Sequence, residues 1–163
     1  MTAPAPATAT QIVIFKLGDD LFAADVFAVE RVLRHTPPTA IPNVPPWIVG
    51  VIDYQQRVVP VIDLRRRFGL PAAEVKPETR LLVLNAGGEW IGAVVDTVVE
   101  VVSVDIAAIT PPPPMFRGLA GEYLRGLVRR ADKLVICLDV PRLLSTTDRL
   151  TLDDARTEAA AHA

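Results

Sequence analysis

Residues 46–68, PWIVGVIDYQQRVVPVIDLRRRF, decide the fold because the chain repeats their pattern at 122–144, EYLRGLVRRADKLVICLDVPRLL. The two stretches align without a gap and place Gly50 over Gly126. An internal repeat in constant register indicates one structural unit that is built twice. We therefore expect two similar units that pack side by side, with a groove between them.

A second repeat precedes the first in each half of the chain. Residues 12–33, IVIFKLGDDLFAADVFAVERVL, and 81–102, LLVLNAGGEWIGAVVDTVVEVV, share the pattern of apolar run, turn and apolar run. The turns fall at residues 18–20 and 87–88, where glycine tolerates a positive φ. Each stretch therefore predicts a β-hairpin. The prolines of residues 36–46 exclude regular helix and predict a rigid loop.

The repeated stretch itself predicts two strands followed by a short helix. WIVGVID (47–53) and RVVPVI (57–62) are joined by a tight turn, and Pro60 predicts that the second strand is an edge strand or carries a bulge. Asp63 then stands where a helix N-cap belongs. Asp139 repeats this arrangement in the second half, with a proline in the first helical turn.

Many short strands, frequent Gly and Pro, and only two short helices predict a mainly β protein made of paired small β-barrels. Residues 1–10 are Ala, Pro and Thr after the first Met and predict a disordered tail. Residues 11–150 are expected to form one domain of two barrel subdomains. Residues 151–163 are expected to be a frayed helix or tail.

Composition limits the classes of partner. The 163 residues are 50% hydrophobic, carry a formal net charge of -2 and have a pI near 5.7, so a general field that attracts nucleic acid is not expected. The apolar stretches are far shorter than the roughly 18–20 residues that span a bilayer. The N-terminus lacks a signal-peptide pattern. The sequence predicts a soluble, cytoplasmic protein that neither inserts into membranes nor binds nucleic acid.

Few residues are suited to catalysis. The chain has two histidines, His35 and His162, two serines without a nucleophile-elbow sequence, and one cysteine, Cys137, in an apolar run. Neither a metal-ligand spacing nor a phosphate-binding glycine motif occurs. We therefore expect no enzyme activity, cofactor or metal. The basic run Arg65–Arg67 predicts a solvated helix face or, alternatively, a surface for an anionic partner.

An ordered set of motifs resembles the CheW-like family of coupling proteins from bacterial chemosensory arrays. The resemblance covers residues 11–150, and its motifs are FKLGDDLFAADV, the spaced Ile41, Asn43 and Pro45, VVPVIDLRRRFGL, IGAVVDTVVEVV, and EYLRGL followed by VICLDVPRLL. It implies two SH3-like five-stranded β-barrels around a shared core. It also implies a non-enzymatic adaptor, recruited to membrane-associated arrays, that joins the cytoplasmic tips of chemoreceptors to the regulatory domain of a CheA-type histidine kinase.

The resemblance also implies a set of partner-binding residues. Positions that match family contact sites are Val29, Gly50, Thr79, Gly92, Val98 and Val101. The alternative interpretation is that these residues are barrel-core and tight-turn positions. Two further members of the predicted set depart from the family pattern, because Gln55 replaces a turn arginine and Arg31 replaces a glutamate.

Altered charges at an interface change partner choice. The two departures therefore leave open an adaptor of a non-flagellar system, either a type IV pilus pathway or a surface-sensing second-messenger pathway. A small-barrel ligand-binding protein is the less favoured alternative.

Overall fold

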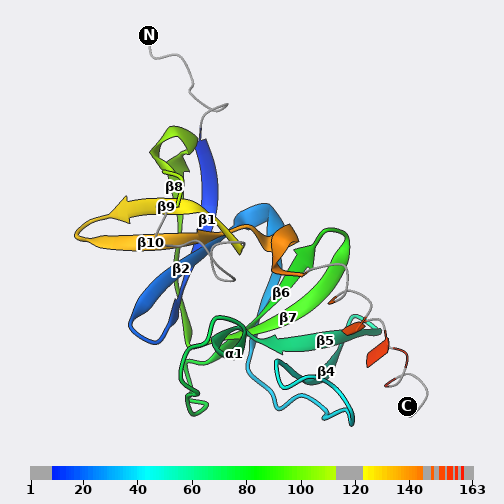
Figure 1. The fold of residues 1–163 in the computed structure, drawn as a ribbon. Helices are drawn as coiled ribbons and strands as arrows, with labels where there is room; N and C mark the ends of the chain where they lie inside the picture. Colours follow the sequence, from blue (N-terminus) through cyan, green and yellow to red (C-terminus); the bar gives the residue numbers. More distant parts are fainter. Residues whose placement is uncertain are drawn as a thin grey trace.

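The computed structural model describes residues 9–112, 123–144, 148, 151, 152, 154, 155, 157 and 159 (Figure 1). These residues form two five-stranded sheets. Sheet A has the order β8-β1-β2-β10-β9 and contains β1 (Ala9–Leu17), β2 (Asp20–Asp25), β8 (Thr97–Asp105), β9 (Leu124–Arg130) and β10 (Lys133–Leu138). Sheet B has the order β3-β6-β7-β5-β4 and contains β3 (Val29–Arg34), β4 (Ile48–Tyr54), β5 (Arg57–Asp63), β6 (Arg80–Ala86) and β7 (Glu89–Val95).

Short helices connect the strands. They are η1 (Val26–Ala28), α1 (Leu64–Arg67), η2 (Ile106–Ala108) and η5 (Val140–Leu143). Within the part of the chain that the structure describes, no helix is both long and apolar enough to cross a membrane.

The two sequence repeats do not coincide with the two sheets. The first repeat supplies β1–β5 and the second supplies β6–β10, but β3 pairs with β6 and β8 pairs with β1. The third strand of each repeat therefore lies in the same sheet as the first two strands of the other repeat. Sheet B is consequently built from the continuous run β3–β7, whereas sheet A combines β1 and β2 with β8–β10. The expectation that each half forms its own unit was wrong, because the strands cross over.

The repeats nevertheless share irregularities of pairing. The β3–β6 register skips Glu30 and the β1–β8 register skips Val99, which are equivalent positions in the two repeats. Val49 in β4 and Arg125 in β9 are skipped in the same way. Bulges increase the local twist of a strand. The same twist is therefore built into both sheets at the same places.

Each sheet is closed by a two-bond bridge between its edges. The Thr39 and Val51 backbones exchange N–H···O bonds of 2.8 and 2.9 Å, which join the chain after β3 to β4. Thr110 and Leu127 do the same at 2.9 and 2.8 Å, and join the chain after β8 to β9. Two small barrels result, as predicted. They are called barrel A and barrel B after their sheets.

The repeated glycines make this closure possible. A Cβ atom on Gly50 would lie 2.3 Å from the carbonyl oxygen of Thr39, and one on Gly126 would lie 2.4 Å from that of Thr110. Both distances are far below van der Waals contact. The alignment of Gly50 with Gly126 therefore records the close approach of the closing segment in each barrel.

The apolar residues form three clusters. Barrel A encloses Ile12, Ile14, Ala23, Val102, Val128, Val135 and Cys137. Barrel B encloses Tyr54, Val59, Val61, Leu81 and Val83. The largest cluster lies between the barrels and takes residues from both sheets, from α1 and η5, and from Leu152. This shared core fixes the two barrels against each other.

Several local predictions are confirmed. Glycines with positive φ form the first and third hairpin turns, at Gly18 and at Gly87 and Gly88. The Asp63 carboxylate accepts bonds from the amides of Arg65 and Arg66 at 3.0 and 3.3 Å, and so caps α1.

Other local predictions need correction. β5 lies between β7 and β4, so Pro60 is not on an edge strand, and the pairing with β7 begins only at Val61. Asp139 makes no capping hydrogen bond through its side chain. β1 begins at Ala9 and takes in the last two residues of the predicted tail, whereas residues 1–8 lie outside the described part of the chain.

Candidate functional site

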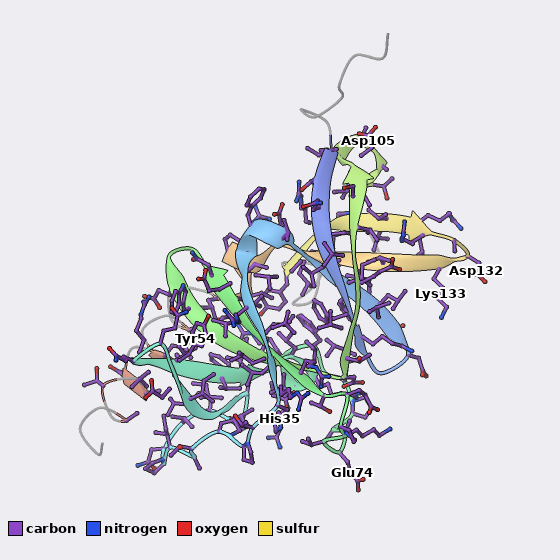
Figure 2. All side chains as sticks on the ribbon, turned by 180° about the vertical axis from the view of Figure 1, so that it is seen from behind. His35, Tyr54, Glu74, Asp105, Asp132 and Lys133 are labelled. Carbon is purple, nitrogen blue, oxygen red and sulfur yellow. The ribbon has the colours of Figure 1, made fainter. Side chains whose placement is uncertain are left out.

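Four of the eight predicted partner-binding residues lie on the exchanged strands β3 and β8. Val29 pairs with Leu84 and Val98 pairs with Phe15, at equivalent positions of the two repeats. Both valines are half-buried and pack against the shared core. Figure 2 shows β3 and β8 on the same side of the molecule, with core side chains between them. We call this surface the β3–β8 face.

The outer part of the β3–β8 face is more apolar along β8. Val101 is 53% exposed and Val99 is 45% exposed, while β3 contributes Val32 and the exposed Arg31. Glu100, between the two exposed valines, pairs with Arg130 at 3.3 Å. Contiguous exposed apolar side chains are the usual mark of a binding surface. The face is suited to packing against an apolar stripe of a partner.

Three other predicted residues are buried and have clear structural roles. Gly50 admits the closing segment of barrel B. The Thr79 hydroxyl accepts a hydrogen bond from the Lys76 amide at 2.9 Å and holds the turn before β6. Gly92 leaves room for Leu81 and Val61 inside barrel B, because its Cβ would lie only 3.0 and 3.2 Å from their side chains. Any effect of these three on a partner would be indirect.

Gln55 lies apart from the β3–β8 face, in the turn between β4 and β5. Gln55 and Gln56 both have positive φ, at 51° and 64°. The Gln55 amide donates to the Tyr54 hydroxyl at 3.2 Å. Tyr54 contacts Trp90, and the Arg57 guanidinium lies 4.0 Å from the Trp90 ring centre. Tyr54 lies on the side of barrel B remote from barrel A in Figure 2, so this turn forms a second, separate candidate surface.

The basic run Arg65–Arg67 was expected to be a solvated helix face, and this prediction was wrong. Arg65 forms an ion pair with Asp96 and donates to the Pro71 carbonyl at 2.7 Å. Asp96 also accepts a bond from the Gly18 amide at 2.7 Å, at the β1–β2 turn. Arg65 thus links α1 to sheet A. Arg66 alone of the three is mainly exposed.

Arg67 contacts the residues that come just before β4 of barrel B and just before β9 of barrel A. Its guanidinium lies 4.6 Å from the ring centre of Trp47 and 5.2 Å from that of Tyr123. It also pairs with Asp148 and donates to the Leu143 carbonyl at 3.1 Å. Trp47 and Tyr123 are equivalent residues, and their carbonyls accept backbone bonds from Asp63, the last residue of β5, and Asp139, the residue after β10. These paired aromatic residues were a sequence signal that the prediction did not use.

Metal-ligating side chains are scattered over the part of the chain that the structure describes, and Cys137 is buried. Among the described residues, no group of three or more His, Cys, Asp or Glu side chains is placed to hold a metal ion. Burial raises the pKa of the Cys137 thiol to about 11, against the opposing effect of Arg125. Such a thiol is protonated near neutral pH and is a poor nucleophile. The described surfaces are suited to binding.

Comparison with known proteins agrees with the geometry. The CheW-like domain model matches residues 11–148. The chemotaxis protein CheW of Klebsiella aerogenes is 33% identical over 144 residues, which are 88% of this chain and 87% of that protein. Protein FrzA of Myxococcus xanthus is 34% identical over 134 residues, covering 81% of this chain and 83% of its own.

A solved structure extends the likeness to three dimensions. The scaffolding protein TtCheW from Thermoanaerobacter tengcongensis superposes with a TM-score of 0.80 at 29% identity, covering 91% of this chain and 96% of its own. The family model spans both barrels, and the fold, the relatives and the solved structure agree. The chain therefore belongs to the CheW-like domain family.

Proposed function

We propose that this protein is a non-enzymatic adaptor that couples chemoreceptors to a CheA-type histidine kinase in bacterial chemosensory signalling. The observation that carries the proposal is the pair of equivalent strands, β3 and β8, which present apolar residues beside the shared core of a CheW-like fold. Residues 11–150 would act as the adaptor domain. The expected location is the cytoplasm, at membrane-associated receptor arrays.

The β3–β8 face is the proposed site for the receptor tip. An amphipathic helix binds by laying its apolar stripe on an apolar surface, and Val98, Val99 and Val101 offer such a surface. A different surface, which includes the turn at Gln55, would contact the kinase regulatory domain. Single contacts of this size are weak, and repetition in an array raises the effective affinity.

Arg31 and Gln55 favour a second candidate within the same class. Both are exposed, and both differ in charge from the residues that the family pattern predicts. A changed charge at a rim position alters specificity more than the fold. An adaptor of a non-flagellar chemosensory system is therefore the alternative. Testing the protein with the receptors and kinases of each system distinguishes the two candidates.

The experiment reconstitutes kinase autophosphorylation with the cognate kinase and a receptor cytoplasmic fragment. Val101→Asp is expected to lower receptor co-sedimentation and kinase activation by about tenfold or more, since it places a charge on the apolar face. Val101 is exposed, so the fold should persist. Val98 is a poorer choice, because its side chain packs on the shared core.

Leu134→Asp is the matched control. Leu134 is 51% exposed in β10 and follows Asp132 and Lys133, which lie at the far tip of barrel A in Figure 2. This variant should activate the kinase normally. Equal activation by Val101→Asp and wild type would contradict the placement of the receptor on the β3–β8 face, and failure of wild type to activate would contradict the adaptor role.

A further inference from the structure

The chain after η5 leads from the barrel junction to the outer surface of barrel B. Leu152 is fully buried and belongs to the shared core, and Ala155 is 2% exposed. Ala159 lines a groove whose other lining residues all come from β4, β5 and the segments that flank them in barrel B. In Figure 1 the described parts of this stretch are drawn in red beside β4 and β5. We call residues 152–159 the tail segment.

The tail segment turns one face towards the protein. Its described residues are helical, and Leu152, Ala155 and Ala159 are spaced by three and four residues, which places them on the same side of a helix. Asp154 and Thr157, between them, are exposed. Among the residues of the segment that the structure describes, the inward face therefore consists of one leucine and two alanines.

The two ends of the tail segment are held with different strength. Asp148, just before it, forms an ion pair with Arg67, and Leu152 is buried in the shared core. Ala155 and Ala159 each contribute one methyl group, which has little apolar area to bury. A helix of this length is marginal in water without tertiary packing. The far end of the segment can therefore open while both barrels stay folded.

The groove beside Ala159 is mainly apolar and only partly filled. Its volume is about 540 Å³, so a single methyl group at its edge leaves most of it empty. A larger apolar side chain would bury more area there. The tail segment is thus a weak occupant. The apolar residues that line the groove are Ala40, Ile41, Pro42, Val51, Ile52 and Val58.

The groove continues into the turn between β4 and β5. Asp53 and Gln56 line it, and Gln55, the predicted partner-binding residue of this turn, is next to Gln56. Residues 152–159 carry three acidic side chains and one arginine. Since Asp53 adds a carboxylate to the groove, charge does not favour closure. The groove and the turn at Gln55 are therefore one continuous surface that the tail segment only loosely shields.

We propose that the tail segment is an autoinhibitory cover of barrel B. When it is closed, as in this structure, Ala155 and Ala159 hold it against the barrel. When it opens, the groove becomes an extension of the surface around Gln55. The inhibitory role rests on the proposed function, in which that surface contacts the kinase regulatory domain. Closure of the segment and binding of the kinase then oppose each other.

Substitutions at Ala159 should move the cover in opposite directions. Ala159→Leu fills the groove, so it should slow amide hydrogen exchange at Ala155 about tenfold. Ala159→Glu places a charge against the apolar lining, so it should speed this exchange about threefold or more and shift the methyl NMR signals of Ile52. Thr157→Leu and Thr157→Glu are the matched controls on the exposed side of the segment. Neither control should change the exchange rate by more than about twofold.

The same variants then measure inhibition. The kinase regulatory domain should bind Ala159→Glu about threefold or more tightly than wild type, and Ala159→Leu about tenfold more weakly. The proposal is overturned if Ala159→Glu leaves exchange at Ala155 unchanged, or if variants that alter this exchange bind the kinase domain as wild type does. Failure of wild type and Ala159→Glu alike to bind would contradict the proposed kinase contact, while the exchange results would still show whether the segment is a cover.

Discussion

The two barrels are alike inside and different outside. Gly50 and Gly126 admit equivalent closing segments, and the same bulges recur in both sheets. On the surface, Glu30 of β3 corresponds to the exposed Val99 of β8. Backbone approach and core volume tolerate few changes, whereas surface positions contribute little to stability. One fold, used twice, can therefore offer two unlike surfaces to two unlike partners.

The junction between the barrels shows the same contrast. In the second repeat Asp96 is engaged by Arg65, whereas the equivalent residue of the first repeat, Phe27, is 90% exposed. At the equivalent helix position, Arg67 lies between two aromatic rings, where the other repeat has the buried Leu143. The repeats diverged where they meet each other and where they meet solvent.

The largest expected effect tests the likeness of the barrel closures. Gly50→Ala and Gly126→Ala should each lower the free energy of unfolding by about 3 kcal/mol, because the new Cβ meets a backbone carbonyl that cannot move aside. Gly92→Ala meets only the Leu81 and Val61 side chains and should cost about 1–2 kcal/mol. Urea unfolding measures all three. If only one of Gly50→Ala and Gly126→Ala lowered the free energy of unfolding, the two barrel closures would not be equivalent.

The next effect tests the difference at the junction. Arg67→Leu copies the other repeat, but it leaves the carboxylate of Asp148 without this partner and removes two cation–π contacts. We expect a loss of about 2–3 kcal/mol, at the lower limit for breaking a buried pair. Adding Asp148→Asn should restore part of the loss. Arg66→Leu is the exposed control and should change stability by less than about 0.5 kcal/mol.

A smaller effect distinguishes the turn between β4 and β5 from the equivalent turn between β9 and β10. Gln55 and Gln56 both adopt positive φ, whereas the equivalent turn has Ala131 at 54°. Asn and Gly adopt this conformation with little strain. The double change Gln55→Asn with Gln56→Gly should raise the free energy of unfolding by about 1 kcal/mol, and Ala131→Gly by about half of that. Unchanged urea midpoints would show that these turns are unstrained.

The smallest effect concerns the interiors. Cys137 corresponds to Val61, so Cys137→Val should change stability at pH 7 by less than about 1 kcal/mol. Burial raises the pKa of the thiol from 9.0 to about 11. The thiol therefore contributes stability below about pH 9 that is lost as the pH rises towards 11. Unfolding at pH 8 and pH 10.5 should show this loss in wild type and not in the variant.

Much of the local structure could be predicted because local patterns determine it. The hairpins, the Asp63 cap and the paired glycines follow from turn geometry and from the repeat. The fold class is confirmed for the same reason, because short strands in two equivalent sets fit two small barrels. The hairpins and the cap depend on residues near one another in the chain.

The exchange of β3 and β8 could not be predicted, because alternation of apolar residues identifies a strand and not its neighbour. The ion pairs of Arg65 and Arg67 were missed for a related reason, since Asp96 and Asp148 are distant in sequence. Of the eight predicted partner-binding residues, Gly50, Thr79 and Gly92 are buried, and only the structure distinguishes them from exposed residues such as Val101. Their roles in binding remain predictions.

The strand exchange has a consequence for synthesis on the ribosome. Barrel B is a continuous run of chain, so all of its strands leave the exit tunnel before β8 does. β1 and β2, made first, must wait for β8–β10, made last, before barrel A can close. In the nascent chain the β1–β2 hairpin therefore lacks its two other neighbours, β8 and β10, through most of translation, and barrel B is the first barrel whose strands are complete.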